Sequence, residues 1–512
     1  NAVMAWARIC GMTFWLLFPF IFIGAFQLGL QYLFGQSIIA VDMFLNLVTT
    51  KSSEALELLD NLIPAIVIVV VLYIPALILA TISIVHKRRL SEAFIRQARR
   101  RTLYVLSAGI LSLGSAYLTD DRYELKSELY PANVCYNIAL AFQRTAQTRN
   151  YHKTSKDFTF HARSTHQADE REVYVMVVGE TSRACNWALY GYERETNPGL
   201  SGIGGLTAFS HVLTESNTTH KSVPMLLSPV SASSFDSIYY QKGIITAFKE
   251  AGYQTAFFSN QRYNHSYIDF FGKEADTYDF IKEDVGDSNY NPSDDKLLKL
   301  VAKELGKGVS RQFIVLHTYG SHFNYKERYP AEQAFFLPDM PVDAEVKYKD
   351  NLINAYDNSI RYTDNFLVRL IDMLQKQHVN SALIYTSDHG EDIFDDNRHL
   401  FLHASPVPSY YQIHVPFFIW MSDNYRQRYP SLLEAAQANR QKNVSSSASF
   451  FQTMLEIGGV ETPYRNDSLS VTSALFIERP RVYLNDHNEA RTLDDVGMLK
   501  EDFKMLEEKG IR

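Results

Sequence analysis

The chain has 512 residues, of which 46% are hydrophobic and 13% aromatic, so it is long enough for more than one domain and can fill a large core. Lys and Arg number 50 against 57 Asp and Glu, a formal net charge of -7. This balance argues against the strongly basic surface of nucleic-acid-binding proteins, so no nucleic-acid partner is expected, and the apolar content excludes general disorder.

Three apolar segments near the start of the chain predict membrane-spanning helices. Residues 62–85 contain no charged side chain and are long enough to cross a hydrocarbon core about 30 Å thick. Residues 12–34 form a second segment of this kind, and residues 102–118 form a shorter third one. The alternative for each is a buried helix of a soluble core, and it carries most weight for the third.

The charges between these segments predict their orientation. Residues 86–101 contain a run of Lys and Arg with Glu92 as the only acid, which is typical of a cytoplasmic connection. Residues 35–61 are acidic apart from Lys51, which suits the opposite face. The third helix then leads outward, and we expect everything beyond about residue 120 to lie outside the cytoplasm. We also expect an N-terminal part, with helices of its own, before Asn1.

These patterns predict three regions. Residues 1–118 form the transmembrane domain, 119–168 a connector of amphipathic segments near the membrane surface or an ordinary linker, and 169–512 an exported domain. The chain has 3 cysteines, so the exported part can form at most one disulfide, between Cys135 and Cys185, and is not a disulfide scaffold.

Short apolar runs in the exported part predict an α/β domain. They are separated by helical stretches such as 355–375, and they lie at 173–178, 254–259, 313–317 and 382–387. Runs that are apolar on both faces and alternate with helices favour a mostly parallel sheet that helices cover on both sides.

Polar side chains follow these runs directly. Glu180, Asn260 and the pair Asp388-His389 each come just after a predicted strand, and His322 follows another by a few residues. Open α/β sheets bind ligands beyond the carboxyl ends of their strands, so the pattern predicts a site there.

The residue types at these positions indicate a metal. Asp388 and His389 offer a carboxylate oxygen and an imidazole nitrogen, a pair that suits zinc, and Glu180 offers a second carboxylate. A helix cap and a packed histidine are the alternative. Thr219, in "SNTTH", would then be both ligand and nucleophile, because a divalent cation favours the alkoxide form of a hydroxyl. Without a metal this stretch is a polar loop.

Four motifs in order identify a resemblance. "VVGETSRACNWALYGYERETNP", the Thr five residues before Pro in "THKSVP", "HTYGSHFNYKERYP" and "SDHGED" are similar to the membrane-bound phosphoethanolamine transferases of bacterial envelopes, with "YDNSIRYTD" between the last two. The resemblance implies a catalytic domain of the alkaline phosphatase and sulfatase superfamily. It implies that Glu180, Thr219, Asp388 and His389 bind zinc and that Thr219 carries the phosphoethanolamine. His322 and His403 match histidines near the phosphate or a second metal, and both are expected to be catalytic, by supplying a proton or steadying the intermediate.

The resemblance also has departures. "VTTKSSEALELL" looks like the outward-facing helix near the lipid donor, so Thr50 and Glu54 match donor-binding positions, but Lys51 replaces an Asn. The cysteines that flank the nucleophile in polymyxin-resistance members are absent. Asn260 and His265 are expected to contact ethanolamine, although "NQRYNH" lacks the Asn/Lys pattern of those enzymes.

The expected enzyme is a multi-pass protein of the bacterial inner membrane, acting as a monomer with its catalytic domain in the periplasm. Phosphatidylethanolamine would be the donor, and lipid A or lipopolysaccharide the acceptor, with core sugars or glucans as further options. The rivals are a glycerol phosphate transferase, a sulfatase or phosphodiesterase of the same superfamily, and a non-catalytic envelope scaffold. The sulfatase rival is weakened because Ser222-Val223-Pro224 is not followed by the required arginine.

Overall fold

The computed structural model describes residues 7–34, 41, 63–120, 123–167, 171–282 and 291–511. The chain divides into two compact units, Asn1–Ala141 and Phe142–Arg512. The boundary at Ala141 falls inside the segment 119–168 that the sequence predicts as a connector. Thr50 and Glu54, the predicted donor contacts, lie outside the described residues.

The first unit contains the three predicted apolar helices: α1 (Cys10–Phe34), α4 (Ile63–Val85) and α5 (Glu92–Thr119). Two of the described segments, Val67–Val85 and Glu92–Thr119, are long and apolar enough to cross a membrane, and Cys10–Ala25 is a shorter apolar helix. The third helix extends further than the predicted 102–118. Ser91 caps it by accepting a hydrogen bond from Phe94 N, and arginine is a good helix former, so the basic stretch joins the helix.

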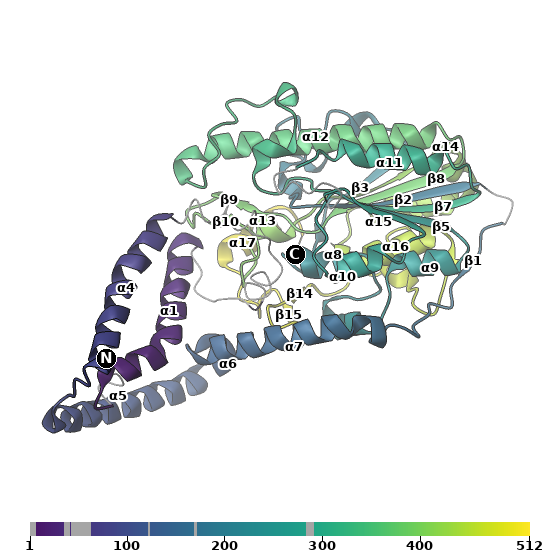
Figure 1. The fold of residues 1–512 in the computed structure, drawn as a ribbon. Coiled ribbons are helices and arrows are strands. Elements are labelled where there is room, and N and C mark those ends of the chain that lie inside the picture. Colours follow the sequence, from purple (N-terminus) through teal and green to yellow (C-terminus); the bar gives the residue numbers. More distant parts are fainter. Residues whose placement is uncertain are drawn as a thin grey trace. The chain divides into compact units, whose positions relative to one another are not determined.

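Helices α1 and α4 pack side by side (Figure 1). A Cβ atom on Gly11 would come within 2.2 Å of the carbonyl oxygen of Ala80, so glycine permits this close approach of the two backbones. The indole of Trp15 donates to Thr81 Oγ1 at 3.2 Å, and Phe18 meets Tyr73 edge to face. The pair is therefore held by specific contacts as well as by apolar surface.

Two helices follow in the predicted connector, α6 (Leu125–Glu128) and α7 (Ala132–Thr154). The second crosses the boundary between the units, and its Tyr151 packs on Tyr267 and Phe270 of the second unit. Cys135 and Cys185, whose pairing the sequence leaves open, are both free thiols.

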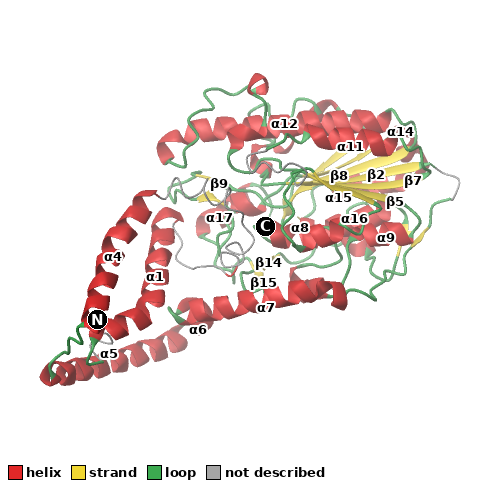
Figure 2. Ribbon diagram, in the orientation of Figure 1, coloured by secondary structure: helices red, strands yellow, loops and turns green. Residues whose placement is uncertain are grey.

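The second unit is built on a seven-stranded sheet in the order β3-β11-β8-β2-β7-β5-β6. Figure 2 shows this sheet in yellow, with β8, β2, β7 and β5 labelled. The four predicted strands are confirmed as β2 (Glu172–Gly179), β5 (Gln254–Ser259), β7 (Arg311–His317) and β8 (Asn380–Ser387), and they run parallel with β6 (Thr277–Phe280). The sequence did not predict β11 (Phe417–Met421), which pairs antiparallel with both β8 and β3 (Leu206–Phe209).

Helices cover both faces of this sheet, as the apolar runs predict (Figure 1). On the central strand, Val173, Val175 and Val177 belong to the core with α11 (Asp295–Leu305) and α12 (Lys349–Gln375). Tyr174, Met176 and Val178 belong to the opposite core with α8 (Thr219–Leu226), α9 (Ile244–Glu250) and α16 (Ser446–Ile457). Alternate side chains of one strand thus fill two cores.

Shorter elements complete the unit. The remaining α-helices are α10 (Tyr267–Gly272), α13 (Tyr410–Ile413), α14 (Asp423–Arg428), α15 (Pro430–Asn439) and α17 (Lys500–Glu508). The remaining strands form two-stranded pairs: β1 (Arg163–Ser164) with β13 (Val460–Glu461), β4 (Val212–Leu213) with β12 (Val444–Ser445), β9 (Asp392–Ile393) with β10 (Phe401–Leu402), and β14 (Val482–Leu484) with β15 (Ala490–Thr492).

Candidate metal centre

Three buried side chains meet at the carboxyl edge of the sheet. Glu180 follows β2, and Asp388 and His389 follow the neighbouring strand β8. All three are fully buried, and each offers a ligand atom within 4.8 Å of the others. The structure therefore brings together the residues that the strand-end pattern predicts.

Thr219 completes this group as the first residue of α8. Its Oγ1 lies 3.1 Å from Glu180 Oε1 and 3.1 Å from His389 Nε2. His389 Nε2 lies 3.5 Å from Glu180 Oε1 and 3.3 Å from Asp388 Oδ2. Four ligands at about 2.0 Å from a tetrahedral zinc are about 3.3 Å from one another. The donor set and its spacing thus fit a zinc ion.

The ring of His389 is held as a neutral ligand. Its Nδ1 lies 2.9 Å from the carbonyl oxygen of Gly390, which can only accept, so Nδ1 carries the proton and Nε2 presents a lone pair. Burial, followed by the charge of His403, lowers the pKa of His389 to about 3. The ring is therefore neutral over the physiological range.

The buried surroundings of Glu180 and Asp388 disfavour negative charge on their side chains. Burial and then repulsion by Asp388 raise the pKa of Glu180 to about 7, and burial raises the pKa of Asp388 to about 6. Backbone N–H groups of Thr181 and His389 donate to Asp388 Oδ1, which leaves Oδ2 facing His389 Nε2. A divalent cation would neutralise both charges, so this electrostatic strain supports a metal site.

A second histidine, His403, lies beside this group. His403, after β10, has its ring centroid 4.1 Å from that of His389, and its Nδ1 lies 3.0 Å from Glu391 Oε2. Burial opposes a charge on the ring, but the hydrogen bond and the charge of Glu391 outweigh it, so the pKa of His403 is raised. Tyr325 donates to the other oxygen of Glu391. The sequence interpretation missed this supporting role of Glu391, although the residue stands in "SDHGED".

His322 lies near His403, with the two ring centroids 6.4 Å apart. Its ring stacks on Tyr319 at 4.8 Å, and its Nδ1 donates to the carbonyl oxygen of Phe323 at 2.6 Å. Burial, and then the charges of Arg328 and His403, lower its pKa well below the usual value. Nε2 of a neutral His322 is thus a hydrogen-bond acceptor near the group.

Asn260 and His265, the two expected ethanolamine contacts, interact with residues outside the metal-ligand group. The Asn260 side chain is fully buried and donates to Asp294 Oδ1 at 2.8 Å and to the carbonyl oxygen of Pro292 at 2.9 Å. His265 is exposed, and its ring lies against Tyr263 at 4.5 Å. Their role in substrate binding stays a prediction.

Gln261 is a further member that the sequence interpretation missed. Its Nε2 donates to Glu180 Oε2 at 2.6 Å and to the carbonyl oxygen of Thr318 at 3.2 Å. The amide thereby occupies one carboxylate oxygen and leaves Oε1 toward Thr219 and His389. Its place after β5 is the one sequence signal that would have pointed to it.

Gln261→Ala is expected to weaken zinc binding by about 10-fold, because partners that orient a metal ligand contribute 10- to 100-fold to affinity. Competition between the purified full chain and a chromophoric chelator would measure this. Asn424→Ala removes an exposed amide that donates to the His378 carbonyl and should leave the affinity unchanged. Equal affinities for the two variants would contradict the positioning role.

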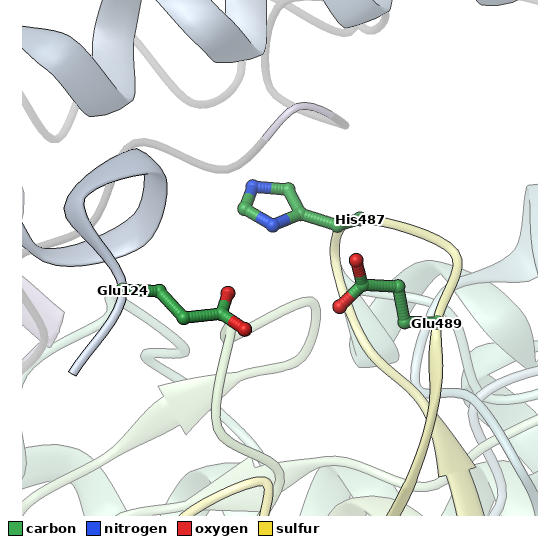
Figure 3. A group of neighbouring side chains, drawn as sticks. All are labelled: Glu124, His487 and Glu489. Carbon is green, nitrogen blue, oxygen red and sulfur yellow. The ribbon is translucent and has the colours of Figure 1, made fainter. Parts of the chain in front are cut away.

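A second group of possible metal ligands occurs among the described residues. Figure 3 shows Glu124 with His487 and Glu489, the latter two in the turn between β14 and β15. Glu124 belongs to the first unit and the other two to the second. Because its members come from two separate units, this group carries no metal assignment.

Comparison with known proteins places these observations in a family. The model of the sulfatase family matches residues 172–460, more than half of the chain. Phosphoethanolamine transferase EptA of Salmonella typhimurium is 30% identical over 319 residues, which cover 58% of this chain and 55% of that protein. The match thus spans about half the length of this curated relative.

Two solved structures share the fold. The integral membrane protein lipooligosaccharide phosphoethanolamine transferase A of Neisseria meningitidis has a TM-score of 0.71 at 22% identity, covering 89% of this chain and 86% of that one. The C-terminal periplasmic domain of EptC from Escherichia coli, solved in complex with zinc, has a TM-score of 0.60 at 23% identity, covering 67% of this chain and 97% of that one. The predicted fold, an alkaline-phosphatase-like α/β domain that follows apolar helices, is confirmed.

Proposed function

This chain belongs to the sulfatase family, and from that premise we propose that it transfers phosphoethanolamine from a phospholipid donor, through Thr219, to a glycolipid of the bacterial envelope. The observation that carries the proposal is the position of Thr219 Oγ1, 3.1 Å from both Glu180 Oε1 and His389 Nε2 at the start of α8. A hydroxyl at this position would become a nucleophile once a bound divalent cation favours its ionised form. The 30% identity to a phosphoethanolamine transferase supports the group that is transferred.

Zinc is the proposed cofactor, held by Glu180, Thr219, Asp388 and His389. The donor types, their spacing and the raised pKa values of the two carboxylates support this choice. Bound there, zinc would favour the ionised form of the Thr219 hydroxyl and neutralise charge on phosphoryl oxygens.

The residues of the chain then have distinct roles in the two steps of the transfer. Thr219 Oγ1 attacks the phosphorus of the donor in its ionised form, its proton having gone to solvent, and the bond from phosphorus to the diacylglycerol oxygen breaks. His403, in its protonated form, donates a proton to that oxygen. The N-terminus of α8 adds favourable electrostatics for the phosphoryl group. In the second step an acceptor oxygen attacks the same phosphorus, neutral His403 takes its proton, and Thr219 Oγ1 leaves.

The membrane unit suits a lipid donor. Extracting acyl chains into water costs about 0.8 kcal/mol per CH₂, and an enzyme anchored in the bilayer avoids this cost. We propose that the chain spans the inner membrane several times, that its second unit lies in the periplasm, and that it acts as a monomer. Phosphatidylethanolamine is the proposed donor, and lipid A or lipopolysaccharide is the proposed acceptor.

Sulfate-ester hydrolysis is the second candidate, favoured by the family alone. Sulfatases use a modified Cys or Ser as nucleophile, and here the position beside Glu180 and His389 is a threonine. Ser222 lies one turn further along α8, where its Oγ donates to the carbonyl oxygen of Thr218 at 2.9 Å, and Leu226 stands where the sulfatase motif has arginine. The nucleophile therefore favours phosphoryl transfer.

A trapping experiment tests the proposal. The full chain, purified with zinc, is incubated with phosphatidylethanolamine without acceptor, and the peptide containing Thr219 is analysed by mass spectrometry. We expect a phosphoethanolamine adduct on Thr219 and release of diacylglycerol. Adding lipopolysaccharide should then discharge the adduct onto the glycolipid. A sulfatase, a glycerol phosphate transferase or an inactive scaffold would leave Thr219 without this adduct.

A further inference from the structure

The first unit has a groove on its apolar surface. A space of about 330 Å³ is lined by Trp15 of α1 and by Ile74, Leu77, Ile78, Thr81 and Ile82 of α4. These α4 positions recur at helical spacing and form one stripe, which Trp15 borders through its hydrogen bond to Thr81. The lining is apolar apart from that satisfied pair, so an acyl chain matches it better than any polar ligand.

Positive charge is concentrated at one end of this groove. Lys87, Arg88 and Arg89 follow the end of α4 at Val85, and all three are exposed. The backbone N–H of Leu90 donates to the carbonyl oxygen of Arg8 at 2.9 Å, which ties this basic segment to the start of α1. The exposed Arg96, Arg99, Arg100 and Arg101 continue the positive surface along the first turns of α5.

Little negative charge offsets this cluster. In the described part of the first unit before residue 120, Glu92 is the only acid, and it pairs with Arg8 at 2.9 Å. Each basic residue near a bilayer surface contributes about 1 kcal/mol of attraction to anionic lipids. The cluster thus complements a negative headgroup.

The groove and the basic residues that follow α4 are close enough to form one binding site. An α-helix rises 1.5 Å per residue, so α4 ends at Val85 roughly 5 Å along the axis beyond Ile82, and Lys87 to Arg89 follow directly after that end. That is the order of the separation between the phosphate of a phospholipid and the upper part of its acyl chains. An apolar groove with cations directly beyond its end suits a single anionic lipid.

We propose that α1, α4 and residues 87–89 bind an anionic diacyl phospholipid of the bilayer, with one acyl chain in the groove beside Trp15 and its headgroup on Lys87, Arg88 and Arg89. The site belongs to the first unit alone and does not depend on the transfer reaction or on zinc. It would fix the tilt of α1 against α4 in a membrane that contains anionic lipid.

Native mass spectrometry of the full chain tests this proposal. The protein in detergent is given equal amounts of phosphatidylglycerol and phosphatidylcholine with the same acyl chains. Retention of phosphatidylglycerol is expected to exceed that of phosphatidylcholine by about tenfold or more, since a few cations at 1 kcal/mol each suffice for that ratio. Equal retention would mean unspecific lipid around the helices and would overturn the proposal.

Two sets of variants separate the headgroup from the chain. The triple variant Lys87→Gln, Arg88→Gln and Arg89→Gln should lose the preference, whereas Lys299→Gln, Lys303→Gln and Lys307→Gln, exposed cations on or just beyond α11, should keep it. Ile78→Trp fills the groove and should reduce retention of both lipids. Leu79→Trp, which adds the same ring off the stripe, should not. A preference unchanged in the first triple variant, or equal effects of the two Trp variants, would overturn the site.

Discussion

Replacing Thr219 with Ala is expected to lower phosphoethanolamine transfer by about 10⁴- to 10⁶-fold, because catalytic groups that act as a unit fail together when the nucleophile is removed. Glu180, Asp388 and His389 remain, so the variant should still bind zinc and fold. The measurement is transfer of labelled phosphoethanolamine to lipopolysaccharide, together with zinc content and thermal unfolding of the same samples.

The neighbouring threonine provides a matched control. Thr218 is the N-cap residue of α8 but makes no side-chain cap hydrogen bond. Its hydroxyl bonds with that of Ser216, and its side chain makes no described hydrogen bond to the metal-ligand group. Thr218→Ala should therefore retain most of the transfer, and Thr219→Ser, which keeps a hydroxyl, should retain a measurable part. Transfer by Thr219→Ala near the rate of the unaltered protein would refute the nucleophile assignment.

Removing zinc is expected to destabilise the protein far more at neutral pH than at about pH 5. Without metal, folding raises the pKa of Glu180 from 4.5 to about 7 and that of Asp388 from 3.8 to about 6. Between the unfolded and folded values the folded state holds protons that the unfolded state has released. The stability of the metal-free protein therefore falls as pH rises through this window, by at most about 1.4 kcal/mol per pH unit for each group.

Zinc reverses this trend because its ligands bind in the deprotonated form. Thermal unfolding of the full chain, with zinc or with a chelator, should give melting temperatures that lie close together near pH 5 and separate progressively toward about pH 7.5. Metal-free protein that is equally stable at both ends of this range would contradict the electrostatic account.

The variant Glu180→Gln tests this electrostatic account most directly. It should abolish the stabilisation by zinc and yet raise the melting temperature of the metal-free protein at neutral pH, since a buried charge is removed. Asp372→Asn changes an exposed carboxylate that pairs with Lys376 and should leave both quantities unaltered. A metal-free Glu180→Gln protein less stable than the unaltered one at neutral pH would show that the carboxylate is not under strain.

Local sequence is sufficient to predict some strands of the sheet but not others. The runs at 173–178, 254–259, 313–317 and 382–387 became β2, β5, β7 and β8, because a strand buried on both faces must be apolar throughout. Strand β11 carries an equally apolar "FFIWM", but its antiparallel insertion between β8 and β3 depends on pairing with residues far away in the chain. A local pattern cannot specify such a pairing.

The candidate metal centre also combines features that local sequence predicts with features that it does not. The sequence by itself determined which side chains could reach the centre, since Glu180, Asp388 and His389 directly follow parallel strands whose ends share one edge of the sheet. Only the tertiary structure decided that Gln261 donates to Glu180, that Glu391 and Tyr325 support His403, and that Asn260 turns toward Asp294. The direction of a loop side chain is set by packing and hydrogen-bond partners from distant segments, and those become neighbours only once the chain has folded.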